Sequence, residues 1–419
     1  MSPPERGPDS APKTVLFAHP APDLYGSDRM LLESVSAAVS AGMRAVVTMP
    51  SDGPLSDLLT AAGARVVSCP TLVLRKALLS PRAVPELVRA TLVGVRSGAA
   101  LLRVRRPDVL VVNTLTIPLW PVLGRFFGIP VIVHVHEAEH EAALPVRLAL
   151  TTPLLAAQAV IVNSRATAAV ISEPGTRSVL GRLQRRLGDR LRDRIQLVYN
   201  GVAGPDPNQL VIAAPTRPDP LRIVYVGRLS PRKGVAVAIR ALAELHQLGH
   251  PASLELAGDV FSGYEWFAGQ LHELVDSLGL TGYVRFAGFV APVWAAYARA
   301  DVAIVPSLTT EPFGNVSVEA QLAGRPVVVA RTQGLVETVR DGITGVVVAP
   351  DDPAALAMAL ARLAADWPAA VAMARAARQD ALHRFGPARY RAQVAGLLGQ
   401  LSAGPPARST EFPSGRASQ

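Results

Sequence analysis

The sequence predicts an α/β fold of two doubly wound parallel sheets, each in its own domain. Short apolar runs rich in β-branched residues alternate with longer amphipathic segments along almost the whole chain, which is the pattern of strand–helix–strand units. The chain has 419 residues, of which 49% are hydrophobic and 18% charged, enough for two or three separate cores. A Pro-rich stretch at 205–220 interrupts the alternation, and we interpret it as the linker between two domains.

The first predicted domain spans residues 13–204 and follows a polar, Pro-rich tail at 1–12 that we expect to be disordered. Apolar runs that end in turn residues predict its strands, because buried parallel strands carry apolar side chains on both faces. The strands are expected at 14–18, 44–49, 64–68, 109–113, 131–135, 159–163 and 195–199. Helices are expected at 28–41 and 82–106.

The second predicted domain spans residues 221–385 and repeats the alternation. Residues 353–385 are predicted to be helical with an interruption at Pro368, since a proline inside a helix removes a hydrogen bond. A final helix is predicted at 386–401, and the Pro-, Ser- and Arg-rich segment 402–419 is expected to be disordered. The strands are expected at 223–226, 253–257, 284–287, 302–305, 327–329 and 345–348.

The composition narrows the classes of protein that fit. The single cysteine, Cys69, excludes an internal disulfide and fits a reducing compartment, so we expect a cytoplasmic protein. The first twelve residues lack the apolar core of a signal peptide, and no uninterrupted apolar stretch predicts a spanning helix. Aromatic residues are only 5% of the chain and do not interleave with the basic ones, which argues against nucleic acid as a partner.

The formal net charge is +9, and it is unevenly placed. Segment 177–194 carries seven arginines, and its leucines recur at spacings of three and four, so it predicts a basic amphipathic helix. Such a helix could lie on an anionic membrane surface at the inner face of the membrane, and 82–106 is a second candidate. The alternative is a helix that faces the core and has a solvated basic back.

Segment 311–319 holds two carboxylates eight positions apart, Glu311 and Glu319, separated by a Pro-Phe-Gly-Asn turn and a helix start. The first N–H groups of a helix lack intrahelical partners and lie at the positive end of its dipole, so they suit a phosphate. The two acids can accept hydrogen bonds from sugar hydroxyls on either side. The alternative is a surface helix with two solvated acids. The residues expected around the phosphate are Phe313, Gly314, Asn315 and Val316.

Segment 222–234 reads as a strand, a glycine turn and a helix start, with Gly227 and Arg228 in the turn and Lys233 at its end. The chain has only three lysines, at 13, 76 and 233, so arginine is its ordinary surface cation. A compact ammonium and an arginine fork both suit a diphosphate. The alternative for Lys233 is a solvated loop cation.

These two segments resemble the Gly-Arg-Leu-x-x-x-Lys-Gly and Glu-x7-Glu motifs of retaining glycosyltransferases with the GT-B fold, in particular glycosyltransferase family 4 (glycosyl transferases group 1). The resemblance covers roughly residues 13–400. It implies two Rossmann-like domains facing across a cleft, a final helix that crosses back to the first domain, and a nucleoside diphosphate sugar as donor substrate. No resident cofactor or metal is implied, because cationic side chains replace the divalent ion.

The resemblance also implies roles for single residues. Arg228 and Lys233 would stabilise the leaving diphosphate, Glu311 would bind the donor sugar, and Glu319 would bind the ribose hydroxyls. The acceptor hydroxyl could belong to a lipid, a cell-envelope glycan or a small metabolite. The segment that contains Gly288 resembles the loop that binds the base through its backbone.

The first domain is expected to line the cleft with Gly26 and His136. The family usually carries Gly-Gly where this chain has Tyr25 and Gly26. Gly26 would let the backbone approach a phosphate closely. The alternative is an ordinary turn in which Asp28 caps the helix. His136, followed by Glu137, matches the family's His–acid pair that contacts the transferred sugar. His134 lies on the same side and is expected to be structural; a zinc site of these residues with His140 would be incomplete.

Two rival functions remain open. One is a sugar-nucleotide epimerase or hydrolase on the same fold, which would need an acid or base pair at the sugar. The other is a non-catalytic protein that binds a membrane surface through its basic helix. The donor sugar, the base, the acceptor and the oligomeric state are left open.

Overall fold

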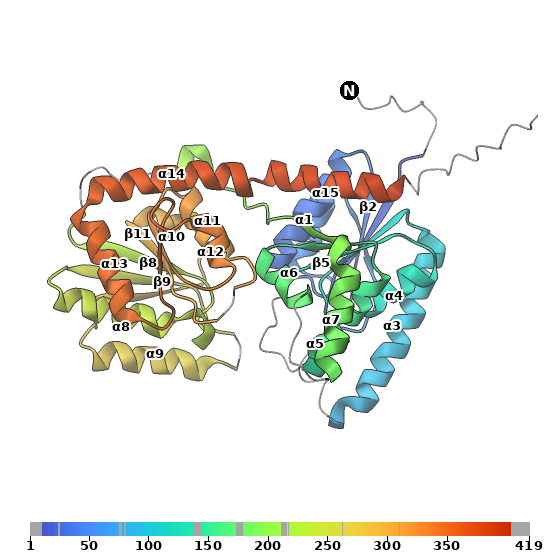
Figure 1. The fold of residues 1–419 in the computed structure, drawn as a ribbon, viewed down its shortest axis with the longest axis horizontal. Coiled ribbons are helices and arrows are strands. Elements are labelled where there is room, and N and C mark those ends of the chain that lie inside the picture. Colours follow the sequence, from blue (N-terminus) through green and yellow to red (C-terminus); the bar gives the residue numbers. More distant parts are fainter. Residues whose placement is uncertain are drawn as a thin grey trace, which may run out of the picture.

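The computed structural model describes residues 11–23, 26–74, 78, 81–136, 144–172, 179–210, 216, 218–261, 263–309 and 311–403. Tyr25, Lys76, Glu137, His140 and Arg177 lie outside these ranges, as do parts of the predicted linker and most of both predicted tails. Two parallel sheets, each with helices on both faces, form two domains side by side (Figure 1). This confirms the predicted fold class.

The first sheet has seven parallel strands in the order β3-β2-β1-β4-β5-β6-β7. Their central members are almost entirely apolar and buried on both faces, as the runs of Val, Ile and Leu predict. The strands are β1 (Thr14–Ala18), β2 (Arg44–Met49), β3 (Arg65–Ser68), β4 (Val109–Asn113), β5 (Val131–Val135), β6 (Ala159–Val162) and β7 (Ile195–Leu197).

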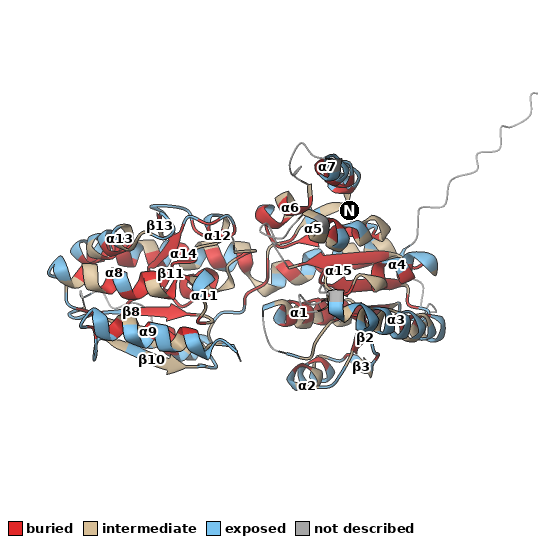
Figure 2. Ribbon diagram, turned by 90° about the horizontal axis from the view of Figure 1, so that it is seen from below, coloured by how far each residue is buried: buried red, intermediate tan, exposed pale blue. Residues whose placement is uncertain are grey.

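Helices cover both faces of this sheet. Alternate residues of β1 point to opposite sides: Phe17 packs in one core with α1 and α2, and Leu16 packs in the other with α3, α4, α5 and α7. Figure 2 shows these inner surfaces as buried, with the outer surface of α3 exposed. The helices are α1 (Gly26–Ser40), α2 (Pro54–Ala61), α3 (Val84–Arg105), α4 (Leu119–Phe126), α5 (Leu144–Thr151), α6 (Arg165–Ser172) and α7 (Val179–Leu191).

The second sheet has six parallel strands in the order β10-β9-β8-β11-β12-β13. They are β8 (Leu221–Val226), β9 (Ala252–Ala257), β10 (Val284–Gly288), β11 (Val302–Val305), β12 (Val327–Ala330) and β13 (Val346–Val348). One core holds α8 (Val235–Gln247), α9 (Glu265–Ser277) and α13 (Pro353–Ala365). The other holds α10 (Trp294–Arg299), α11 (Asn315–Leu322) and α12 (Leu335–Thr338).

The last two helices, α14 (Trp367–Phe385) and α15 (Pro387–Ser402), form a rod that spans both domains along the top of the view in Figure 1. α14 packs on α11 of the second domain, and α15 packs on α1 of the first. Tyr390, Val394 and Leu398 of α15 are buried in the core of the first domain. The chain therefore returns to its first domain to complete that core.

The helical break expected at Pro368 lies two residues earlier, at Asp366. The Asp366 carboxylate accepts a hydrogen bond from the Ala369 backbone N–H at 3.2 Å and so caps α14. Pro368 stands in the first turn, where its missing N–H would have no intrahelical acceptor. In the described part of the chain no single helix is long and apolar enough to cross a membrane, and only α13 joined to α14–α15 passes that test, across a 103° bend.

Candidate active site

A cavity of about 450 Å³ opens at the carboxyl ends of the second sheet's strands, beside the first turn of α1. Parallel sheets of this kind bind ligands at that edge. A second cavity, of about 390 Å³, lies among Arg222, Arg285 and Arg299, away from the predicted site residues. Predicted residues that line the first cavity are Gly26, Gly227, Arg228, Lys233 and Glu311, and they are joined there by Arg232, Phe261, Phe289 and Pro312.

The turn between β8 and α8 carries the cations of the cavity. Gly227 has φ 140° and Gly234 has φ 69°, conformations that L side chains rarely adopt. A Cβ at Gly234 would lie 1.8 Å from the Pro306 carbonyl oxygen, so only glycine lets the turn pack against the end of β11. The turn thereby places Arg228 and Lys233 at the cavity wall.

Glu311 and Lys233 form an ion pair at the cavity, with 2.6 Å between Lys233 Nζ and Glu311 Oε1. The Ser307 hydroxyl donates a second hydrogen bond to the same oxygen at 2.7 Å. Burial alone would raise the pKa of Glu311, but the Lys233 ammonium, the Ser307 hydroxyl and the Arg232 charge together lower it. Glu311 is therefore an ionised acceptor.

Glu319 lies on α11 and is only 7% exposed. Its Oε1 is 3.5 Å from Nη1 of Arg29, on α1 of the other domain. Burial raises the pKa of Glu319, and the Arg29 charge only partly opposes it. Glu311 and Glu319 thus flank the start of α11 with opposite shifts in pKa.

The turn before α11 brings the two domains into contact. The Asn200 side chain donates to Asn315 Oδ1 at 2.9 Å, and a Cβ on Gly26 would lie 3.2 Å from Asn315 Nδ2. Gly314 has φ 92°, and a Cβ there would lie 2.4 Å from a Leu335 methyl carbon. The start of α11 is therefore seated on Leu335 and faces the first turn of α1.

The remaining predicted site residues lie at different places. The Phe313 side chain is 2% exposed and packs against Tyr199 and Phe385, so only its backbone belongs to the turn. Val316 is partly buried against the second domain's core. Gly288 ends β10 with φ 66° beside the cavity, and its neighbour Phe289, 79% exposed, lines it.

His136 does not line this cavity; it follows β5 in the first domain and contacts Asn113. Within the described residues, no three His, Cys, Asp or Glu side chains gather closely enough to hold a metal ion. Two members of the zinc alternative, Glu137 and His140, lie outside those residues. The two predicted first-domain site residues, Gly26 and His136, both lie in the described part of the chain, and of the two only Gly26 lines the cavity.

Sequence reasoning missed Arg29, Phe261 and Phe289 as members of the site. The Arg228 guanidinium lies over the Phe261 ring, 3.2 Å from its centroid, so Phe261 covers one face of this cation. Phe261 follows the Ala-Gly-Asp turn after β9, and Phe289 follows Gly288. Aromatic residues within three positions of a glycine turn at a strand end are the signal that could have identified Phe261 and Phe289.

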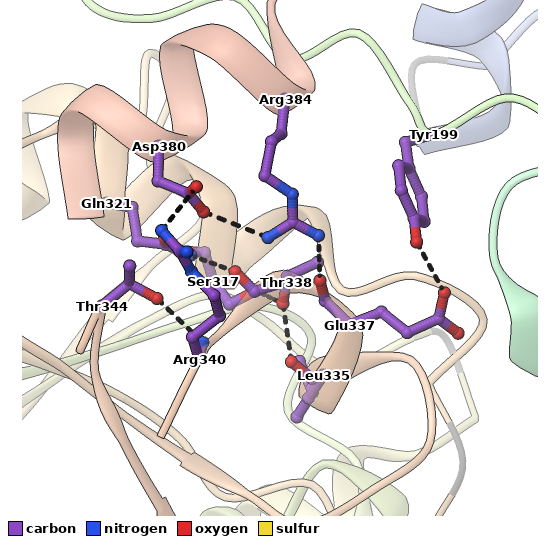
Figure 3. Close-up of polar contacts among 10 residues, drawn as sticks. All are labelled: Tyr199, Ser317, Gln321, Leu335, Glu337, Thr338, Arg340, Thr344, Asp380 and Arg384. Atoms are coloured by element: carbon purple, nitrogen blue, oxygen red, sulfur yellow. Dashed lines mark hydrogen bonds and ion pairs between the residues drawn. The ribbon is translucent and has the colours of Figure 1, made fainter. Parts of the chain in front are cut away.

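Glu337 on α12 makes the main polar contact between the domains. Its carboxylate accepts hydrogen bonds from the backbone N–H groups of Arg165 and Ala166, both at 2.9 Å, at the start of α6. The Tyr199 hydroxyl donates to the same carboxylate at 3.2 Å (Figure 3). Burial, followed by the Glu337 charge, raises the pKa of Tyr199. A carboxylate of the second domain therefore caps a helix of the first.

A polar network supports α11 from behind (Figure 3). Ser317 and Thr338 share a hydrogen bond of 2.6 Å between their hydroxyls, and the Gln321 amide donates to the Thr338 carbonyl at 3.1 Å. Arg384 of α14 donates to the Glu337 carbonyl at 2.7 Å and pairs with Asp380 at 3.0 Å. The helix that carries Glu319 is thus fixed to α12, and α12 is fixed to the rod.

Comparison with known proteins agrees with this geometry. The family model "Glycosyl transferases group 1" matches residues 211–380, and "Glycosyl transferase 4-like domain" matches 26–201. Among curated proteins, the uncharacterized glycosyltransferase MJ1607 of Methanocaldococcus jannaschii is 31% identical over 207 residues, 46% of this chain and 50% of that protein. D-inositol 3-phosphate glycosyltransferase of Salinispora arenicola is 42% identical over 168 residues, 38% of this chain and 37% of that protein.

The matched segments span half or less of the length of these curated relatives. Solved structures are similar over nearly the whole chain. Anabaena Alr3699/HepE in complex with UDP has a TM-score of 0.73 at 22% identity, covering 93% of this chain and 100% of that one. Sucrose-phosphate synthase from Thermosynechococcus elongatus has a TM-score of 0.71 at 21% identity, covering 94% and 100%.

The fold and its neighbours define the class: two Rossmann-like domains arranged as in GT-B glycosyltransferases. The matches to the two family models give independent support from the sequence. The second domain carries the group 1 glycosyltransferase sequence and the first carries the 4-like domain, which together support a glycosyltransferase similar to glycosyltransferase family 4.

Replacement of Glu337 by Ala is expected to loosen the contact between the domains. A carboxylate at a helix start contributes about 1 kcal/mol, so open forms should become about fivefold more populated. Small-angle X-ray scattering of the unliganded protein should then give a larger radius of gyration than that of the wild type. Glu265→Ala, on the outer helix α9, is the control, and equal curves for all three proteins would contradict the expectation.

The two acids should respond oppositely to removal of their charge. The lowered pKa of Glu311 contributes stability above the unfolded pKa, and that stability is lost as pH falls through the folded pKa. The raised pKa of Glu319 contributes stability below the unfolded pKa, and it is lost as pH rises through the folded pKa. At pH 7, Glu311→Gln should therefore lower stability by about 1–3 kcal/mol, and Glu319→Gln should leave it equal or higher.

Thermal unfolding between pH 4 and pH 7.5 measures both effects. The difference between wild type and Glu311→Gln should shrink toward the acid end, whereas the Glu319→Gln advantage should appear only at the neutral end. Two variants with the same loss at every pH would show that neither shift contributes to stability.

Proposed function

We propose that this protein is a retaining, metal-independent glycosyltransferase that moves a sugar from a nucleoside diphosphate sugar to an acceptor hydroxyl. The observation that carries the proposal is the cavity between the domains, where Arg228 and Lys233 lie beside Glu311. Glu319 lies eight residues further along, past the start of α11. Cations for a diphosphate and acids for hydroxyls are the groups that a nucleotide sugar needs.

The diphosphate would lie against Arg228, Lys233 and the backbone N–H groups at the start of α11. Negative charge develops on the leaving diphosphate as the glycosidic bond breaks, and fixed cations in a partly dry cavity stabilise it. One such contact lowers the free-energy barrier by about 3 kcal/mol, which raises the rate about a hundredfold. These side chains would take the place that a divalent ion has in other transferases.

The two ends of the donor would bind to the two acids. Glu319 would accept hydrogen bonds from the ribose hydroxyls, and Glu311 would accept them from the donor sugar. The base would lie at the loop after Gly288, beside Phe289. Uracil is the first base to test, since the similar Anabaena structure is a complex with UDP.

The acceptor would approach from the first domain, where His136 and Gly26 lie. For retention we propose attack from the same face as departure, and we assign no covalent nucleophile. The acceptor class is proposed to be a lipid or a cell-envelope glycan, because both would bring the enzyme to a membrane surface.

The outer helices of the first domain support a peripheral contact with the cytoplasmic side of a membrane. On α7, Leu187 and Leu191 face the core, whereas Leu180 and Leu183 are 41% and 53% exposed among arginines. On α3 an exposed aliphatic stripe runs along Val84, Val88, Leu92 and Val95, spaced four, four and three residues apart. Basic residues around an exposed apolar stripe suit an anionic bilayer.

The alternatives on the same fold make different products. A hydrolase or epimerase would consume or convert the donor without an acceptor, whereas a non-catalytic membrane-binding protein would do neither. The intact set of Arg228, Lys233, Glu311 and Glu319 favours transfer. Thin-layer analysis of a radiolabelled donor with and without candidate acceptors separates these outcomes.

Lys233→Ala should lower the rate of transfer at least about a hundredfold, because the cation at the leaving diphosphate is lost. Lys13→Ala is the matched control, since Lys13 pairs with Asp108 on the surface at 2.9 Å, outside the cavity. The first measurement is a thermal-shift panel of UDP-, GDP- and ADP-sugars, in which the true donor raises the melting temperature of wild type and Lys13→Ala but not of Lys233→Ala. Turnover of that donor follows, and full activity of Lys233→Ala would end the assignment.

Vesicle binding should depend on the exposed apolar residues of α3 and α7. Leu92→Asp or Leu183→Asp should reduce co-sedimentation with phosphatidylglycerol vesicles about five- to tenfold, because each adds a repelled charge to the contact. Leu248→Asp, an exposed leucine of the second domain, should bind as the wild type does. Equal binding of all four proteins, or none by the wild type, would remove the membrane from the proposal.

A further inference from the structure

A buried chain of hydrogen bonds connects the start of α1 to His136. His19 Nε2 lies 2.8 Å from Asp28 Oδ1, His19 Nδ1 lies 3.1 Å from Asn113 Nδ2, and His136 Nε2 lies 3.0 Å from Asn113 Oδ1. Asp28, His19 and Asn113 are each at most 4% exposed. Three buried polar side chains thus lead to one ring nitrogen of His136.

One main-chain oxygen sets the direction of every bond in this chain. The Ser27 carbonyl accepts from Asn113 Nδ2 at 3.2 Å, and because a carbonyl can only accept, the amide nitrogen of Asn113 must point that way. The same nitrogen then donates to His19 Nδ1, so the proton of His19 is on Nε2 and is donated to Asp28. The Asn113 oxygen faces His136, so Nε2 of His136 carries its proton.

This chain of hydrogen bonds lies directly behind the wall of the candidate site. Ser27 follows Gly26, which lines the cavity and approaches Asn315. Arg29, the residue after Asp28, reaches Glu319. The first turn of α1 therefore directs Asp28 into the first domain, toward His19, and Arg29 across to the second.

His134 confines His136 on another side. The two rings lie 3.9 Å apart, and burial lowers the pKa of His134 to about 3, so this neighbour is uncharged at neutral pH. His134 Nδ1 lies 3.5 Å from the Tyr390 hydroxyl, and no described residue makes a hydrogen bond with its Nε2. Burial, followed by the electrostatic effect of the neighbouring His134 and His19 rings, lowers the pKa of His136 well below its usual value, and Asp28 partly opposes this shift. His136 is thus held as a neutral ring of fixed orientation.

We propose that Asp28, His19 and Asn113 are positioning residues that fix the orientation and tautomer of His136 for the transfer reaction. With its proton on Nε2, His136 has Nδ1 as its acceptor nitrogen. The inference rests on the proposed function for the role of His136 toward substrate. The hydrogen-bond chain itself does not depend on that role.

Asn113→Asp is the sharpest variant, because it keeps the shape of the side chain and replaces the donor to Ser27 and His19 by an acceptor. We expect kcat to fall about a hundredfold with a donor KM changed less than threefold, since binding of the nucleotide lies in the other domain. Asp28→Asn keeps an acceptor oxygen for His19 and should retain most of the activity, whereas Asp28→Ala should not. Tyr390→Phe changes a buried residue beside His134 that does not belong to the hydrogen-bond chain. This variant should lower thermal stability and leave kcat unchanged.

The tautomer is measured separately, by two-bond ¹H–¹⁵N spectra of protein labelled at histidine, with His136 assigned from a His136→Gln variant. The wild type should show the Nε2–H form at His136, and Asn113→Asp or Asp28→Ala should lose it. Retention of both kcat and tautomer in those variants would overturn the proposal, as would an equal loss of kcat in Tyr390→Phe. If the wild type transfers no sugar from any donor, the proposed function fails, but the spectra still decide whether the chain fixes His136.

Discussion

The candidate site depends on the ion pair between Lys233 and Glu311, whose side chains are only 27% and 12% exposed. Both partners come from turns at the carboxyl ends of neighbouring parallel strands, β8 and β11, so the sheet itself determines their separation. Burial of an isolated carboxylate is costly, and its pairing with Lys233 and the Ser307 hydroxyl offsets that cost. If the diphosphate of the proposed substrate bound the Lys233 ammonium, Glu311 would lose this partner. Glu311 could then accept hydrogen bonds from the sugar hydroxyls of that substrate.

Close backbone packing makes this pair possible, and glycine makes the packing possible. A Cβ at Gly234 would meet the Pro306 carbonyl at 1.8 Å, and one at Gly258 would meet the Gly227 carbonyl at the same distance. The turns that follow β8, β9 and β11 are therefore in direct contact, with no side chain between them. Such contact leaves room for the cations and aromatic rings to line the cavity instead of filling the space between turns.

The sequence was sufficient for the fold and for placing Arg228, Lys233 and Glu311 at one edge of the second sheet, because both follow from local patterns. Apolar runs identify buried parallel strands, and a Gly turn or a Glu-flanked helix start lies within one strand–turn–helix unit. It was insufficient where a role depends on partners far along the chain. Arg29 and Glu319 are 290 residues apart, and nothing local distinguishes Arg29 from the many solvated arginines. The break expected at Pro368 was misplaced because Asp366 caps the helix and makes proline acceptable after it.

The same limit explains why the first domain's edge was harder to interpret. His19, Asp28, Asn113 and His136 belong to the ends of three strands and the start of a helix, and each alone reads as an ordinary turn or cap. Tyr390, which lies beside His134, comes from the far end of the chain, on α15, and makes hydrogen bonds with Ser34 and the Met30 carbonyl. That tyrosine belongs to the first domain's core beside His134, so this core is complete only after the chain has returned from its second domain. The rod of α14 and α15 therefore does more than join two domains. It packs on α11, which carries Glu319, and on α1, which carries Asp28 and Arg29, so elements of both halves of the site rest on the same pair of helices.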